Sequence, residues 1–273
     1  LIECPLLELL KKGGFMSSGD EYSFLDQPEI LQFVFYPRRD YAPGPTNSSD
    51  HLIHVDTDID ISCRFYIHSN DSPCILYFHG NGEVVSDHDY VAPEYEGIGV
   101  NLFVADYRGY GRSGGMPGFQ SMVDDAHLVF RAFLDIKKET GHSGNLFVMG
   151  RSLGSISAVE LAYHHPEDIN GLILESGLAS ISGLISRMGH NIANEDTTFS
   201  DFPNLAKIRD ITLPTLILHG EYDMLIPFTH AKAMFDASTA KDKRLEIIPY
   251  AGHNDIIFQG REQYFSAIET FVC

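Results

Sequence analysis

Short apolar segments recur along this chain and alternate with segments of helical periodicity, and this alternation constrains the fold more than any other feature. Two early segments alternate in part between apolar and polar residues, and the later ones are nearly continuously apolar. Continuous apolar runs are typical of strands covered on both faces, as in a parallel sheet. The eight predicted strands are His51–Val55, Arg64–Ile67, Cys74–Phe78, Asn101–Ala105, Leu146–Met149, Leu172–Leu174, Thr215–Leu218 and Leu245–Ile248.

Helical patterns lie between these strands. In the first of them, the apolar residues from Ala126 to Leu134 recur on one stripe, as expected for a helix that covers a sheet. Such alternation implies right-handed strand–helix–strand units and an α/β fold with a doubly wound, mostly parallel sheet. The predicted helices are Met122–Lys138, Leu153–His164, His230–Ser238 and Asp255–Val272.

The length of 273 residues fits one α/β domain. A loop at 41–50, rich in Pro, Gly, Ser and Asn, divides the chain into an N-terminal extension and the main domain. We expect residues 1–50 to pack on the core as an accessory element and residues 51–273 to form the α/β domain. The connection between Ser176 and Leu213 is longer than a simple crossover needs, which predicts an insertion at about 177–210.

The charge balance limits the partners of this chain. It carries 19 Lys and Arg against 38 Asp and Glu, a net charge of −19 with neutral histidines. So acidic a surface repels phosphate backbones, and nucleic acid is excluded as a partner. No apolar run is long enough to span a bilayer. The four cysteines show no metal-ligand spacing, and we expect a reducing cytoplasm.

Chemically useful residues follow several of the predicted strands. In open α/β sheets the site lies beyond the carboxyl ends of the strands, so these positions carry the functional signal. Ser152 lies in the G-x-S-x-G match at 150–154, directly after a strand and before a helix. Asp223 and His253 each follow a later strand, and a glycine-rich turn, His79 to Gly82, follows an earlier one.

These residue types fit nucleophilic catalysis by a serine. A serine hydroxyl is a weak nucleophile and needs a base within hydrogen-bond reach, which His253 supplies. A carboxylate must hold the imidazole in the correct tautomer. Two acids stand at strand ends, Asp223 and Glu175, and spacing alone leaves both open.

A second G-x-S-x-G match shows that the pattern by itself is weak evidence. Gly111 to Gly115 fits it around Ser113. However, no apolar strand directly precedes Ser113, and the following Met116-Pro117-Gly118 cannot start a regular helix. The strand-to-helix context therefore favours Ser152 as the nucleophile and makes Ser113 a turn residue.

Taken together, these pieces resemble the α/β-hydrolase superfamily, in its branch with serine-aminopeptidase-like and prolyl-oligopeptidase-like members. The resemblance runs from about Cys74 to the C-terminus. It rests on five segments: HGNGE at 79–83, DYRGYGRSGG at 106–115, GRSLGS at 150–155, HGEYDMLIP at 219–227 and AGHND at 251–255. It implies an eight-stranded sheet flanked by helices, with the insertion at about 177–210 forming a small cap.

The resemblance also implies roles for individual residues. It places the acid at Asp223 rather than Glu175, and His253 as the base. It makes the backbone N–H groups of Asn81 and Leu153 the oxyanion donors. We further expect an amphipathic helix in this cap to line the acyl or leaving-group pocket with Leu184, Ile185 and Met188. The alternative is that its apolar stripe only covers the sheet.

The expected activity is hydrolysis of a carboxylic ester or thioester through an acyl-enzyme on Ser152, without cofactor or metal. Amide or peptide cleavage is the second choice, because amides need more help for the leaving group. A relative that binds a small ligand without turnover is a third reading. The sequence leaves the acyl group and the oligomeric state open.

Overall fold

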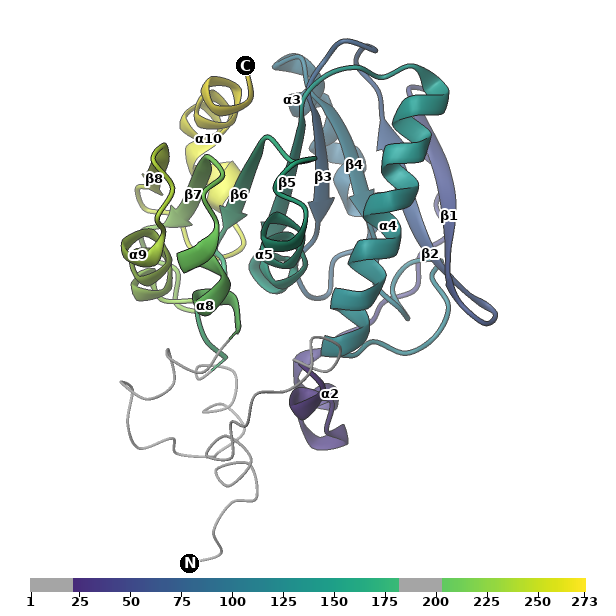
Figure 1. Cartoon of the computed structure of the whole chain (residues 1–273), viewed down its shortest axis with the longest axis horizontal. Coiled ribbons are helices and arrows are strands. Elements are labelled where there is room, and N and C mark those ends of the chain that lie inside the picture. The colour runs from purple at the N-terminus through teal and green to yellow at the C-terminus, as the bar shows by residue number, and fades with distance from the viewer. Residues whose placement is uncertain (1–21, 182–202) are drawn as a thin grey trace, which may run out of the picture.

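A single eight-stranded sheet forms the centre of the molecule in the computed structural model, which describes residues 22–181 and 203–273 (Figure 1). The strand order is β1-β2-β4-β3-β5-β6-β7-β8. β2 runs antiparallel to β1 and β4, and all other neighbouring strands are parallel. This confirms the mostly parallel α/β-hydrolase sheet. The strands are β1 Ser48–Asp56, β2 Ile59–Tyr66, β3 Cys74–Phe78, β4 Asn101–Ala105, β5 Leu146–Arg151, β6 Gly171–Glu175, β7 Thr215–Gly220 and β8 Lys243–Ile248.

Helices cover both faces of this sheet. One face carries α4 (Phe119–Thr140), α5 (Ser155–His164), α8 (Pro203–Asp210) and α9 (Phe228–Ala237), and the other carries α3 (Ala92–Gly97) and α10 (Ile256–Val272). Each face has its own apolar cluster. Strands β3 to β7 are therefore buried along their whole length, as their continuous apolar sequences predict.

The described part of the N-terminal extension packs against the rest of the fold. It contains the short turn η1 (Ser23–Leu25) and helix α2 (Pro28–Val34), which lies beyond the N-terminal end of α4 (Figure 1). Leu25 and Ile30 join the main core cluster. Between them, the Asp26 carboxylate accepts hydrogen bonds from the backbone N–H groups of Phe119 (2.6 Å) and Gln120 (3.1 Å), at the start of α4. A carboxylate at a helix N-terminus satisfies free N–H groups and complements the helix dipole.

Some local structure departs from the sequence expectations. The second strand begins at Ile59 rather than Arg64, because Asp58 adopts a left-handed backbone (φ 58°) and closes a tight hairpin between β1 and β2. Helices α2, α3 and α8 were not expected either, and none is longer than eight residues. Segments this short contain too few apolar residues to show a helical period. Two 3-10 turns complete the described elements, η2 (Val85–Tyr90) and η3 (Ser152–Gly154).

Candidate active site

A sharp turn between β5 and α5 presents Ser152. The residue adopts a left-handed backbone (φ 52°), an unusual conformation that clusters at functional sites. A Cβ on Gly150 would overlap the backbone of Gly154, and one on Gly154 would overlap the carbonyl oxygen of Phe78. Both flanking positions must therefore be glycine. The short turn η3 then leads directly into α5, so free N–H groups lie beside the hydroxyl.

Three side chains from three strand ends form one hydrogen-bonded chain at this turn. The Ser152 hydroxyl lies 3.0 Å from Nε2 of His253, and Nδ1 of His253 lies 2.7 Å from Oδ2 of Asp223. All three residues are buried, each less than one-tenth exposed. The structure thus brings together Ser152, His253 and Asp223, three residues that the sequence places up to 101 positions apart.

The environment of Asp223 keeps its carboxylate charged. Its Oδ1 accepts hydrogen bonds from the backbone N–H groups of Leu225 (2.9 Å) and Ile226 (2.7 Å). Burial by itself would raise the pKa of Asp223, but His253 and the backbone N–H of Ile226 outweigh burial and lower the pKa below its usual range. An ionised Asp223 can therefore hold the imidazole proton on Nδ1 and leave Nε2 free to accept one.

Glu175, the rival acid, has different partners. It ends β6, next to β5, and its register partner is Arg151. Its Oε1 accepts from Nε of Arg151 at 3.0 Å, and its Oε2 accepts from the Tyr264 hydroxyl at 2.7 Å. The structure thus places Glu175 in a buried ion pair, while Asp223 contacts His253.

Arg151 links the parts of the site, and the sequence analysis did not single it out. Besides Glu175, its guanidinium donates to the Glu83 carboxylate, to the backbone carbonyl of His253 (2.8 Å) and to Oδ1 of Asn254 (3.1 Å). The other Glu83 oxygen accepts from the N–H of Gly80 (2.8 Å). One buried cation therefore ties the serine turn to the glycine-rich loop and to the histidine loop. The sequence offered one signal for Arg151, because it is a charged residue directly before the predicted nucleophile.

The glycine-rich loop after β3 carries Asn81. A Cβ on Gly80 would overlap the Arg151 guanidinium, so a larger residue there would have to displace the guanidinium. The Asn81 side chain is engaged elsewhere. Its Oδ1 accepts from the Tyr110 hydroxyl (2.7 Å) and from the Tyr36 N–H (3.0 Å), and its Nδ2 donates to the Val34 carbonyl. Asn81 and Leu153, the two expected oxyanion donors, both line the pocket at Ser152.

Ser113 has a structural role. Its side chain is fully buried, and its Oγ accepts a hydrogen bond from the backbone N–H of Ser62 in β2 at 2.9 Å. Its own N–H donates to the Tyr110 carbonyl (2.8 Å), which closes a tight turn. The second G-x-S-x-G match is therefore part of a loop that braces β2.

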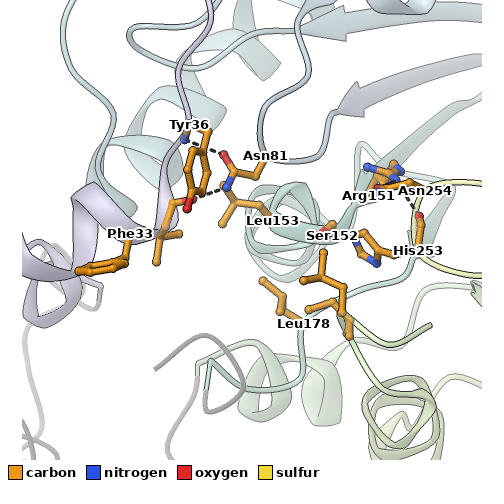
Figure 2. Close-up of a pocket in the computed structure, with 12 residues that line it drawn as sticks. Phe33, Tyr36, Asn81, Arg151, Ser152, Leu153, Leu178, His253 and Asn254 are labelled. Atoms are coloured by element: carbon orange, nitrogen blue, oxygen red, sulfur yellow. Dashed lines mark hydrogen bonds between the residues drawn. The ribbon is translucent and has the colours of Figure 1, made fainter. Parts of the chain in front are cut away.

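A pocket of about 450 Å³ opens over Ser152 (Figure 2). The predicted pocket residues Leu184, Ile185 and Met188 lie outside the described residues. Instead, part of the described wall comes from the N-terminal extension, which sequence reasoning did not connect to the site. Within the described ranges, no group of three or more His, Cys, Asp or Glu side chains could hold a metal ion. The lining residues are Phe33, Val34, Tyr36, Asn81, Arg151, Ser152, Leu153, Leu178, Leu225, Ile226, His253 and Asn254.

The sheet order, and the strand-end positions of the serine, histidine and aspartate, define the class as an α/β-hydrolase. The chain belongs to the serine aminopeptidase S33 family, whose model matches residues 70–195 and 204–257. The chain is 34% identical to the human alpha/beta hydrolase domain-containing protein 17B over an alignment of 224 residues that covers 78% of this chain and 70% of that protein. The Xenopus tropicalis protein of that name is 33% identical over the same shares.

Solved structures show the same fold at low sequence identity. An esterase of Pyrococcus furiosus superposes with a TM-score of 0.69 and 18% identity, covering 86% of this chain and 97% of that one. Est1E of Butyrivibrio proteoclasticus, solved with ferulic acid bound, superposes with a TM-score of 0.64 and 20% identity, covering 81% and 97%. Among the described residues, no helix has the length and apolar character to cross a membrane.

Proposed function

We propose that this protein is a serine hydrolase that cleaves a carboxylic ester or thioester through an acyl-enzyme on Ser152. The observation that carries the proposal is the buried chain from Ser152 Oγ through His253 to Asp223, with donor–acceptor distances of 3.0 and 2.7 Å. Such a chain supplies a base to a weak nucleophile and an anion to stabilise the charged base.

The first half of the reaction forms the acyl-enzyme. His253 Nε2 takes the Ser152 proton as Oγ attacks the carbonyl carbon, and Asp223 stabilises the imidazolium that results. The N–H groups of Leu153 and Asn81 donate to the oxyanion. The imidazolium then gives its proton to the departing oxygen or sulfur.

The second half releases the acid. Water replaces the leaving group, His253 takes a proton from it, and the hydroxide oxygen attacks the acyl carbon. When the tetrahedral species collapses, the proton returns from His253 to Ser152 Oγ, and the carboxylic acid leaves.

The choice of esters over amides rests on leaving-group chemistry and on relatives. Alkoxide and thiolate groups leave with less protonation than amines do, and one structure with the same fold is the esterase of Pyrococcus furiosus. The family description, a serine aminopeptidase, makes amide hydrolysis the second candidate.

Cys63, Cys74 and Cys273 are free thiols, which supports our further proposal that the protein works in a reducing cytoplasm.

Intact-mass analysis after fluorophosphonate treatment tests the nucleophile. We expect one adduct on the parent chain and on Ser113→Ala, and none on Ser152→Ala. A panel of esters, thioesters and amides then ranks the leaving groups. An adduct that persists in Ser152→Ala would refute the assignment. No adduct, together with no turnover on the panel, would favour a protein that only binds its ligand.

A further inference from the structure

Two exposed aromatic side chains of the N-terminal extension stand at the pocket. Phe33 is 54% exposed and Tyr36 is 62% exposed, although Val34 and Phe35 between them are buried. Both exposed rings line the pocket over Ser152. Large aromatic side chains at the mouth of a site offer apolar area to a ligand at a low cost in conformational entropy.

The backbone beneath these rings is anchored. Phe35 packs its ring edge-on against Phe119 of α4, with ring centres 5.2 Å apart. Ile30 and Val34 point into the main core cluster. The packing of these buried residues therefore fixes the backbone that carries Phe33 and Tyr36 at the pocket.

The Asn81 side chain clamps this segment to the glycine-rich loop. Its amide bonds the carbonyl of Val34 and the N–H of Tyr36, so it holds both sides of Phe35 (Figure 2). The Tyr110 hydroxyl completes the clamp, because it donates to Asn81 Oδ1 (2.7 Å) and accepts from the Tyr36 N–H (3.0 Å). The segment that carries Phe33 and Tyr36, which forms one wall of the pocket, is thereby tied to the loop that carries the proposed oxyanion donor.

Further along the segment, Arg38 adds two more bonds to the same region. Its Nε donates to the carbonyl of Gly82 at 3.3 Å, and its guanidinium pairs with Asp87. The chain from Val34 to Arg38 thus follows the glycine-rich loop closely.

The anchored wall lies outside the part of the chain that the family model matches. That match begins at residue 70 and includes Ser152, Asp223 and His253. The catalytic groups therefore come from the shared part of the chain, and Phe33 and Tyr36 come from a part that the family model does not describe. Specificity can differ between family members through this segment while the chemistry stays the same.

We infer that Phe33 and Tyr36 are specificity-determining residues, which contact the apolar part of the substrate that extends from the scissile carbonyl. This inference rests on the proposed function. Leu178, Leu225 and Ile226 add further apolar side chains to the pocket lining, which also contains the polar residues Asn81, Arg151 and Asn254. A chain or ring between these walls loses water contact on both sides, and each buried methylene contributes about 0.8 kcal/mol, or about fourfold in affinity.

The test compares p-nitrophenyl acetate, butyrate and octanoate on Phe33→Ala, Tyr36→Ala and Tyr110→Phe. We expect kcat/KM for octanoate, relative to acetate, to fall about fourfold for each methylene contact that an alanine variant removes. Tyr110→Phe keeps its ring but loses the hydroxyl of the clamp, and we expect a smaller shift in the same direction. Tyr41→Ala is the matched control, since Tyr41 is 69% exposed and does not line the pocket.

A binding measurement separates this inference from the proposed chemistry. N-methyloctanamide is titrated calorimetrically into Ser152→Ala, and into Ser152→Ala combined with either Phe33→Ala or Tyr36→Ala. Weaker binding by the double variants supports the role of these side chains even if the parent chain hydrolyses no ester. An affinity that neither alanine change lowers would overturn the inference, whether or not Ser152 is catalytic.

Discussion

Replacing Arg151 by methionine tests whether one guanidinium allows two carboxylates to lie beneath the site. Arg151 is 9% exposed and contacts Glu83 and the fully buried Glu175. Methionine keeps much of the volume but removes the charge and the hydrogen bonds. Breaking a buried ion pair from one side costs about 3–5 kcal/mol, because the partner charge remains buried without compensation. Whole domains are stable by only about 5–15 kcal/mol.

Protonation of Glu175 should limit this loss at low pH. Burial raises the pKa of Glu175 even though Arg151 and Tyr264 oppose the shift. Without Arg151, the pKa rises further. A carboxyl whose pKa is raised by folding destabilises the native state as pH rises through that folded pKa. The loss of unfolding free energy in Arg151→Met, relative to the parent chain, should therefore be largest at about pH 8 and smaller at about pH 5.

Urea unfolding followed by far-ultraviolet circular dichroism measures these free energies. The matched control is Arg151→Met combined with Glu175→Gln, which removes the more deeply buried of the two carboxylate charges left without Arg151. We expect the double variant to recover at least about 1 kcal/mol relative to Arg151→Met. The reasoning is wrong if Arg151→Met stays within about 0.5 kcal/mol of the parent chain at about pH 8. It is also wrong if Glu175→Gln restores nothing.

Three further predictions follow from single contacts. Asp223→Asn keeps the shape but favours the wrong imidazole tautomer, so kcat for an ester should fall by about 10⁴ with an unchanged dichroism spectrum; a fall under tenfold contradicts the assigned role. Burial lowers the pKa values of His88 and His230 to about 4, so the unfolded chain binds protons first and stability should decline as pH falls from about 6.5 toward 4. Urea midpoints that stay level over this range would contradict it. Gly154→Ala should lower the free energy of unfolding by about 1–3 kcal/mol and remove most fluorophosphonate labelling, because the added Cβ would overlap the carbonyl oxygen of Phe78. Normal labelling would refute this.

The order of strands and helices could be predicted from the sequence because each core strand is covered on both faces. Cys74–Phe78 and Asn101–Ala105 begin and end where the apolar runs do. By contrast, the start of β2 was misplaced, because it depends on the left-handed backbone of Asp58. A single residue's backbone conformation leaves no periodic signal.

The candidate catalytic residues could be found from the sequence because carboxyl ends of parallel strands meet at one edge. Ser152, Asp223 and His253 each follow such a strand, and a strand-to-helix turn distinguishes Ser152 from Ser113. The choice between Asp223 and Glu175 was different. The sequence pattern left both acids open, and the structure shows that one contacts His253 and the other Arg151.

By itself, then, the sequence determined the class of fold and the edge of the sheet where the chemistry lies, since both follow from local patterns repeated along the chain. Only the tertiary structure decided what surrounds that chemistry. The hydrogen bonds of Arg151 and the Asn81 clamp join residues 24 to 103 positions apart. No local pattern encodes such contacts, because they exist only when the sheet edge, the glycine-rich loop and the N-terminal segment pack together.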